Sequence, residues 1–418
     1  MRQTLRRSCA ACARAKHSCD LRTPRCSRCI KRRVPCVYAN EPLTAVPEIM
    51  ALRLGSLDPF DSYPQTRLRR DHVQRLIHSF LNKIAFQYYP LDLSAVSNPF
   101  LISWWPLALG DPALFHVSLQ TACLDEELLA QKGFGTSELL MADSVALLRR
   151  RVEDATLAVQ DATMNSVITL ATIEFGKGNV EISKMHVDGV KRLVDMRGGI
   201  NAVRQTSPLT ARMVSWVSML IMCRPQFSTQ DDVGIGDGIP PIPEWQLDGD
   251  PPGLYDTDSI DIDDRVKSVL TRLRRVFGRA QHTPLTSTRL HDLTCFVVHR
   301  LLSAETPSPL TECVRHALIL TMLTAQGPTY YSHGVMLDMI LARFKENMGR
   351  LGPTRGTVGV WLVATGAVAS AGTAHHRWFM ERERAGSWDD AFARIRSLLW
   401  AETLLSRDVF RAHWEAVG

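Results

Sequence analysis

Hydrophobic residues recur at helical spacing along most of the chain after residue 65. Between Val73 and Ile84 the apolar residues follow the i, i+3, i+4, i+7 template, and Arg75 and Lys83 lie elsewhere on the helical wheel. Runs with the same spacing predict further helices at 139–152, 166–175, 184–196, 208–222, 264–277, 290–302, 310–325, 334–348 and 388–405. No stretch of useful length alternates with the period of two that a half-buried strand would show. We therefore predict a large all-α domain of about a dozen helices over residues 66–418.

One uncharged stretch needs a separate test for membrane spanning. Residues 356–376 carry no formal charge over 21 positions, which is long enough to cross a bilayer. Seven of the first seventeen are Gly, Thr or Ser, and most of the others are Ala and Val. We expect a helix of small residues packed inside the domain, and no membrane span.

Residues 41–65 show no helical pattern and separate this domain from residues 1–40. Pro42, Pro47, Pro59 and Pro64 interrupt any continuous helix, and the hydrophobic residues form no sustained heptad. We predict a linker without a coiled coil.

Six of the ten cysteines lie close together near the N-terminus, at Cys9, Cys12, Cys19, Cys26, Cys29 and Cys36. The spacing C-x2-C-x6-C occurs twice, and each half offers three sulfurs, one fewer than tetrahedral zinc requires. If two four-coordinate zinc ions bind, two of the six sulfurs must bridge them. Short helices at 10–17 and 27–33 would not be stable alone, so we expect this module to fold only with metal.

Disulfides and an iron–sulfur cluster are the alternatives for these cysteines. Arg2, Arg6 and Arg7 are followed by no apolar run, so we expect no secretory signal and a reducing compartment, where metal binding is favoured. Ferredoxin spacings also differ from this one. The four scattered cysteines are predicted to be buried structural thiols; they are Cys123, Cys223, Cys295 and Cys313.

Charge is concentrated at the same end of the chain. Residues 1–38 hold eleven Lys and Arg and a single acid, whereas the rest holds 38 bases and 42 acids. A basic module on a mildly acidic body indicates a polyanion-binding segment joined to a domain that does not bind nucleic acid.

The cysteine spacing, together with Lys16, Asp20, Pro24 and Tyr38, closely resembles the fungal binuclear zinc cluster transcription factors. The resemblance implies two Zn²⁺ per chain, with the first and fourth cysteines, Cys9 and Cys26, bridging them. One ion would then be held by Cys9, Cys12, Cys19 and Cys26, and the other by Cys9, Cys26, Cys29 and Cys36.

The resemblance also implies how the module would bind double-stranded DNA. The family lysine that matches Lys16 enters the major groove and reads a CGG-type triplet, since a cationic donor suits the O6 and N7 acceptors of guanine. The alternative for Lys16 is a solvated phosphate contact. His17 beside it is a candidate for adjusting base choice, or is simply exposed. The remaining cations are interpreted as phosphate contacts: Arg14, Arg25, Arg28, Lys31, Arg32 and Arg33. Ala13 and Ser18 stand where the family commonly has a basic residue, which predicts a weaker grip on phosphate.

Two segments of the body resemble the regulatory domain of the same family. His186-x2-Gly189-x3-Leu193-x3-Arg197-Gly198-Gly199 precedes a helix containing Trp216, and residues 57–64 resemble a short motif ahead of that domain. We expect Gly189 to permit close helix packing, Gly198 or Gly199 to end a helix with positive φ, and His186 to be a hydrogen-bonded structural residue. The C-terminal aromatic run is predicted to be core: Trp378, Phe379, Leu398, Leu399, Trp400, Phe410 and Trp414.

Residues 226–263 are rich in Asp, Pro and Gly, which predicts a long surface loop. An alternative is a weak coactivator-binding patch formed by Trp245, Leu247, Leu254, Tyr255 and Ile260.

The sequence thus predicts a nuclear, sequence-specific regulator of RNA polymerase II transcription, controlling nutrient or secondary metabolite genes. Its partners would be DNA and the transcription machinery or coactivators. Without a coiled coil, the protein either forms a homodimer through its helical domain or binds one half-site as a monomer. An enzyme is not expected, because no phosphate-binding Gly loop, G-x-S-x-G or H-E-x-x-H motif occurs. A helical interaction protein or ligand sensor that no longer binds DNA is the other alternative, kept open by Ala13 and Ser18.

Overall fold

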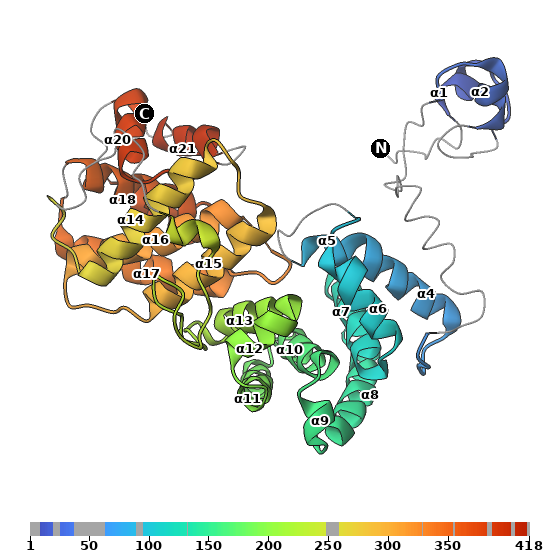
Figure 1. Ribbon diagram of the computed structural model, residues 1–418. Coiled ribbons are helices and arrows are strands. Elements are labelled where there is room, and N and C mark those ends of the chain that lie inside the picture. The colour runs from blue at the N-terminus through green and yellow to red at the C-terminus, as the bar shows by residue number, and fades with distance from the viewer. Residues whose placement is uncertain are drawn as a thin grey trace. The chain divides into compact units, whose positions relative to one another are not determined.

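The computed structural model describes residues 9–19, 26–36, 63–88, 95–131, 133–247, 259–327, 329–353, 356–382, 387–402 and 406–415. The chain divides into two compact units, Met1–Tyr63 and Pro64–Gly418 (Figure 1). Most of the predicted linker, and the motif at 57–64 except for its last two residues, lies outside the described residues.

The first unit contains two short helices, α1 (Ala10–Arg14) and α2 (Ser27–Arg32). They end earlier than the predicted 10–17 and 27–33, because Lys16 and Arg33 adopt left-handed backbone conformations with φ of 50° and 52°. The two helices pack against each other around buried cysteines.

The second unit is helical throughout its described part, which contains no strand and one isolated bridge, between Thr229 and Ile239. Its first group of helices runs from α4 to α13, in blue to green in Figure 1. The elements are α4 (Arg70–Ser79), the π-helix η1 (Phe80–Ile84), α5 (Ala85–Gln87), the π-helix η2 (Phe100–Trp104), α6 (Trp105–Leu109), α7 (Pro112–Ala130), α8 (Gly135–Val152), α9 (Ala155–Ala158), α10 (Asp161–Gly176), α11 (Val180–Met196), α12 (Ile200–Thr206) and α13 (Pro208–Met222). Helix α10 is central, since it packs on α7, α11 and α13.

The second group of helices follows in yellow to red in Figure 1. Its elements are the 3-10 helix η3 (Pro243–Gln246), α14 (Asp264–Ala280), α15 (Ser287–Leu302), α16 (Pro309–Gln326), α17 (Gly334–Leu351), α18 (Gly356–Ala369), α19 (His376–Met380), α20 (Trp388–Leu398) and α21 (Ser406–Glu415). Helix α16 packs on α15, α17 and α18, and α18 also contacts α20 and α21. No described helix is long and apolar enough to span a membrane.

The predicted all-α class is confirmed, and most predicted helices are present with small changes at their ends. The run predicted at 388–405 ends at Leu398, because Leu399 has an extended backbone with φ −157° and ψ 125°. The uncharged stretch at 356–376 forms α18 and then turns before α19. Helix α7, in which residues 113–124 are all buried, was not predicted from sequence.

The predicted C-terminal core is largely confirmed, since Phe379, Leu398, Leu399, Trp400 and Trp414 are buried, whereas Trp378 and Phe410 are half-buried. The thiols of Cys123, Cys295 and Cys313 are also buried, as predicted, and Cys223 is half-buried.

The predicted loop at 226–263 is confirmed in its described part, which is irregular apart from η3 and one isolated bridge, but several of its side chains are buried. Trp245 and Ile260 are buried, so neither can form the coactivator-binding patch considered from sequence, and Leu254 and Tyr255 lie outside the described residues. Asp232 accepts a hydrogen bond from the Trp245 indole at 3.0 Å and forms an ion pair with Arg300 at 2.7 Å. The acidic composition indicated a solvated loop, whereas the carboxylate of Asp232 holds the segment against the body.

Candidate metal centre and nucleic-acid interface

Each short helix begins at a cysteine whose sulfur caps it. The Sγ of Cys9 accepts the backbone N–H of Cys12 at 3.4 Å, and the Sγ of Cys26 accepts that of Cys29 at the same distance. The two halves therefore repeat each other after 17 residues in structure as well as in spacing. Both caps point sulfurs toward the space between α1 and α2.

The six sulfurs form two groups of four. One consists of Cys9, Cys12, Cys19 and Cys26, the other of Cys9, Cys26, Cys29 and Cys36, and within each group the sulfurs lie within 4.8 Å of one another. The Sγ–Sγ distances are 3.6 Å for Cys9–Cys29, 3.7 Å for Cys12–Cys26 and 3.9 Å for Cys9–Cys26. A disulfide would need about 2.05 Å. Two sulfurs at about 2.3 Å from a tetrahedral zinc ion are about 3.8 Å apart, so the distances fit shared zinc ligands.

Within residues 9–19 and 26–36, the described part of this unit's helices, the cysteines supply most of the buried interior. Cys9, Cys12, Cys26 and Cys29 are at most 3% exposed, and the apolar residues packed against them are Ala11 and Val34. So small an apolar core cannot offset the conformational entropy of folding. The fold of this unit therefore depends on what the sulfurs bind.

The thiols differ in how readily they ionise. The hydrogen bond from the Cys12 backbone lowers the pKa of Cys9 to about 6, and the equivalent bond from Cys29 lowers the pKa of Cys26. Burial raises the pKa of Cys12 to about 12 and also raises that of Cys29. A bound cation is what allows buried thiols so close together to be thiolates at once, and a sulfur-rich set of this kind suits zinc.

Lys16 and Arg33 occupy equivalent positions in the two halves. Each follows the first cysteine of its half by seven residues, has a left-handed backbone and is exposed. The next residue donates in both cases to the second cysteine, from the His17 N–H to the Cys12 carbonyl at 3.0 Å and from the Val34 N–H to the Cys29 carbonyl at 3.2 Å. Arg33 is therefore the structural counterpart of Lys16, which its grouping with Lys31 and Arg32 in the sequence did not reveal.

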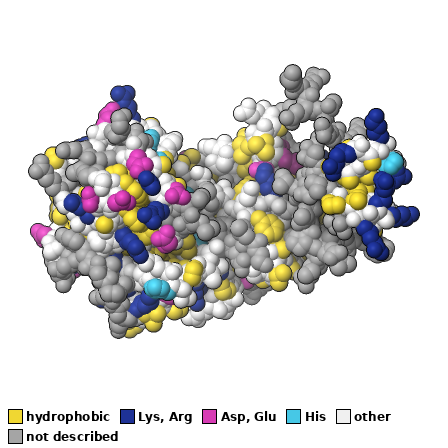
Figure 2. All heavy atoms as spheres, turned by 90° about the horizontal axis from the view of Figure 1, so that it is seen from above, with side chains coloured by type: hydrophobic (Ala, Val, Ile, Leu, Met, Phe, Trp, Pro, Cys, Tyr) yellow, Lys and Arg dark blue, Asp and Glu magenta, His cyan; other side chains and the backbone are white. Residues whose placement is uncertain are grey.

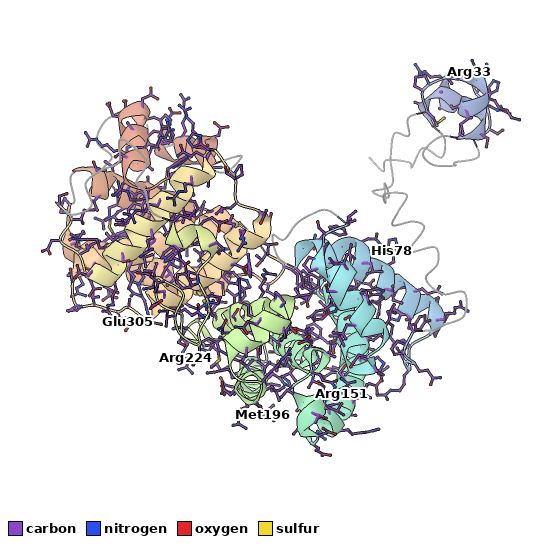
Figure 3. The ribbon with its side chains drawn as sticks, viewed as in Figure 1. Arg33, His78, Arg151, Met196, Arg224 and Glu305 are labelled. Carbon is purple, nitrogen blue, oxygen red and sulfur yellow. The ribbon has the colours of Figure 1, made fainter. Side chains whose placement is uncertain are left out.

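The other predicted DNA-contacting residues that the structure describes are on the surface of the same unit. Lys and Arg side chains gather on it in Figure 2, and Figure 3 labels Arg33. Arg14, His17, Arg28, Lys31 and Arg32 are exposed, and within the described segments none of them forms an ion pair. Arg25 lies outside the described residues, and Ala13 and Ser18 are exposed where a cation was expected. Unpaired cations on one small unit are available for phosphate.

In the body, the sequence signature that runs from His186 to Gly199 forms the end of a helix. Gly198 and Gly199 both have positive φ, 96° and 93°, and they follow Arg197, the C-cap residue of α11. Arg197 pairs with Asp161 and donates to Ser207 at 2.9 Å, which ties α11 to the starts of α10 and α13. His186 is half-buried and, within the described chain, makes no side-chain hydrogen bond, so the prediction of a hydrogen-bonded histidine is wrong; burial lowers its pKa.

Comparison with known proteins gives two family matches. Residues 7–45 match the fungal Zn(2)-Cys(6) binuclear cluster domain, and residues 75–231 match the fungal specific transcription factor domain. The first match contains α1, α2 and all six clustered cysteines, and the second extends from α4 past α13. No curated protein and no solved structure matches the chain.

Proposed function

The chain combines a fungal binuclear zinc cluster domain with a fungal specific transcription factor domain, and from this premise we propose that it regulates RNA polymerase II transcription by reading CGG-like triplets. Residues 1–40 are the DNA-binding module, residues 41–65 the linker and residues 66–418 the regulatory body. The protein acts in the nucleus on nutrient or secondary metabolite genes, recruits coactivators or the transcription machinery, and forms a homodimer through its helical body.

The observation that carries the proposal is the arrangement of the six sulfurs in two groups of four that share Cys9 and Cys26. Two zinc ions per chain would satisfy both groups, each held by four of the cysteines, with Cys9 and Cys26 belonging to both sets. Zinc supplies structural cross-links here and no reaction chemistry.

Basic residues of the module then recognise the DNA. Lys16 stands at the end of α1 on a backbone fixed by the cluster, so that its ammonium group can reach the guanine O6 and N7 acceptors in the major groove. Arg14, Arg25, Arg28, Lys31, Arg32 and Arg33 hold the module on phosphate, and His17 lies beside the reading residue.

The test is selection of random duplexes by the full-length, zinc-loaded chain, followed by gel shift of the selected sequences with and without a chelator. We expect enrichment of a CGG-like triplet and loss of binding on chelation. Zinc-loaded protein that enriches no triplet would favour the helical sensor with a cluster that does not bind DNA. Binding that survives chelation would exclude the cluster as the DNA-binding element.

A further inference from the structure

Helix α11 has two apolar faces, and the described chain covers only one of them. Val187, Val190 and Val194 are buried, and α11 packs on α10 and α13. Elsewhere on the helix, Ile182, Met185 and Met196 are 44%, 62% and 57% exposed. Together with Gly189 they follow the 3-4-7 spacing of a helix that pairs with another helix. We call Ile182, Met185, Gly189 and Met196 the α11 stripe.

Gly189 at the middle of this stripe is not required for close packing against any described residue. A Cβ atom there would meet only Val167 Cγ1, at 3.9 Å, an ordinary contact distance. The expectation that Gly189 permits close packing inside the body is therefore wrong. Glycine in a helix interior is destabilising relative to alanine, so its presence beside exposed methionines fits a close approach from outside.

Two charged residues beside the stripe also lack partners. Asp188 and Arg192 are exposed, and neither forms an ion pair with any described residue. The helical rise puts Asp188 about 1.5 Å before Gly189 and Arg192 about 4.5 Å after it, on the same side of the stripe. In an antiparallel second α11 the order is reversed, so each Asp188 comes beside Arg192 of the second copy.

We propose that two copies of this chain pair through α11, with the two helices antiparallel and crossing at Gly189. The pairing is self-complementary, as a two-fold interface requires: Ile182 faces Met196 of the second copy, and Asp188 faces Arg192 twice. Both ion pairs and both apolar contacts follow from the one symmetry axis.

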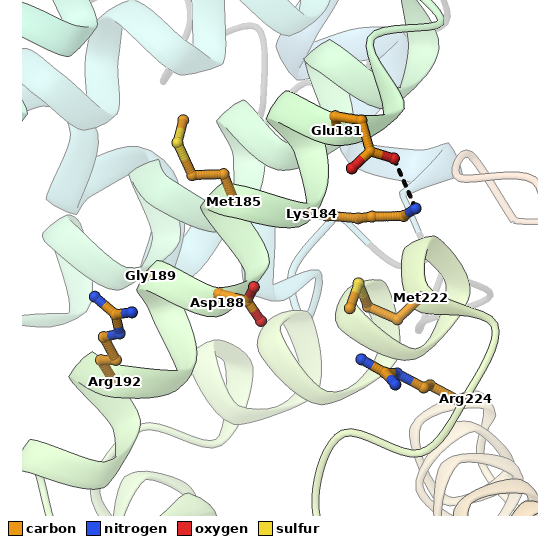
Figure 4. A pocket seen from close by; sticks show the side chains of 8 residues that line it. All are labelled: Glu181, Lys184, Met185, Asp188, Gly189, Arg192, Met222 and Arg224. Carbon is orange, nitrogen blue, oxygen red and sulfur yellow. Dashed lines mark hydrogen bonds and ion pairs between the residues drawn. The ribbon is translucent and has the colours of Figure 1, made fainter.

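The surface extends beyond the helix itself. A pocket of about 580 Å³ opens between α11 and the end of α13, where Lys184 and Asp188 lie toward Met222 and Arg224, and Arg192 lies farther along α11 (Figure 4). Its lining also includes Glu181, which pairs with Lys184 at 2.8 Å, so acidic and basic groups are mixed. Mixed charge suits a protein surface of the same composition better than an anionic small molecule. The pocket enlarges the contact toward the roughly 1,200–2,000 Å² that a stable interface buries.

This inference rests on the homodimer in the proposed function and assigns its surface. The experiment is sedimentation velocity of the full-length, zinc-loaded chain over a range of concentrations without DNA. We expect a reversible dimer, and Met185→Glu should raise its dissociation constant about tenfold or more. Val335→Glu is the matched control, because Val335 is 58% exposed on α17, and it should leave the constant unchanged.

A charge exchange tests the proposed register. Asp188→Arg should weaken the dimer, and Asp188→Arg combined with Arg192→Asp should restore it, since the exchanged charges again attract. Gly189→Cys should form a disulfide-linked dimer on mild oxidation, because the two residues lie on the symmetry axis, whereas Val335→Cys should not.

A monomer at every concentration would overturn the inference. A dimer whose dissociation constant is unchanged by Met185→Glu and by the charge exchange would also overturn it. Tryptophan emission of each variant checks that the body is folded. Since no DNA is present, the sedimentation result does not depend on triplet recognition. If the chain forms no dimer, the duplex selection still tests triplet recognition.

Discussion

Arg212 on α13 holds Asp292 on α15 with two hydrogen bonds, from Nε to Oδ1 at 2.8 Å and from Nη2 to Oδ2 at 3.0 Å. Arg204 on α12 adds an ion pair to the same carboxylate at 2.9 Å, and the Asp292 side chain is 3% exposed. Burial opposes ionisation of Asp292, but the hydrogen bond from Arg212 and the charges of both arginines outweigh it and lower its pKa. These pairs join the two groups of helices in the body.

Asp292→Ala should therefore destabilise the body by about 3–5 kcal/mol, because two largely buried guanidinium groups lose their counter-charge. All nine tryptophans lie at residue 104 or later, so urea unfolding followed by tryptophan emission reports on the body alone. Asp338→Ala is the control: this carboxylate pairs with His375 and its side chain is 64% exposed, so a change of less than about 0.5 kcal/mol is expected. Equal effects of the two substitutions would contradict the role of Asp292.

Acid should destabilise the body through its buried histidines. Burial lowers the pKa of His291 and of His299 to about 4, whereas an unfolded histidine titrates near about 6.5. Between these pH values the unfolded chain binds more protons, so stability falls as pH drops from about 6.5 to 4, and these groups cause no further loss below that. From pH 7 to pH 5 the loss is about 2 kcal/mol for each histidine.

Urea midpoints at several pH values measure this loss, and His299→Leu should reduce the pH dependence by one histidine's share. The exposed His78 is the control, and His78→Leu should leave the dependence as it was. If the dependence of the urea midpoint on pH were unchanged in His299→Leu, His299 would not be a neutral buried group.

Zinc content should follow the grouping of the sulfurs. We expect two zinc ions per intact chain by elemental analysis, and nearly none in Cys9→Ser, since Cys9 is in both groups. Cys223→Ser, outside the cluster, should keep both. A chelator should leave the tryptophan emission of the body unchanged, because every tryptophan lies in the other unit. One ion retained in Cys9→Ser would argue against the shared ligand.

Lys16 and Arg32 should respond differently to substitution. Lys16→Ala should cost about 1–3 kcal/mol on the selected triplet and relax the selected sequence, since it removes a contact to a base. Arg32→Ala should weaken all duplexes about equally and lower the slope of log affinity against log salt by about 0.9, since it removes a contact to phosphate. Gel shifts at several salt concentrations separate the two, and a sequence-selective loss in Arg32→Ala would contradict its assignment.

Gly366 on α18 leaves room for two phenylalanine rings. A Cβ atom at Gly366 would collide with the ring of Phe379 and lie 3.1 Å from Cε1 of Phe344. Gly366→Ala should therefore destabilise the body by about 1–3 kcal/mol. Gly349→Ala on α17 faces open space and should be neutral or stabilise by up to about 1 kcal/mol. Urea unfolding of both variants provides the comparison.

Helices with one polar face were predictable from sequence, as α4 and α14 illustrate, because the contrast between faces sets the period. Helix α7 was not, because residues 113–124 are buried on every side and leave no contrast to detect. Nor was the ion pair of Arg212 with Asp292, which joins residues 80 positions apart and depends on tertiary packing.

The candidate site was easier to predict from sequence than the fold, because cysteine spacing reflects the distances that a metal imposes. The grouping of the sulfurs agrees with that spacing, whereas the left-handed backbone at Lys16 and Arg33 was not predicted. The 17-residue repeat was visible in the sequence, and applying it to the residues between the cysteines would have paired these two cations.

The left-handed backbone at Lys16 limits how this protein could change the sequence that it reads. Valine, isoleucine and threonine are strongly disfavoured at φ near 50°, whatever contact they would make with a base. Asparagine and glycine fit this conformation well, and unbranched side chains are tolerated. Variants selected for altered recognition should therefore carry changes at position 16 drawn from this small set, with other gains coming from neighbouring residues.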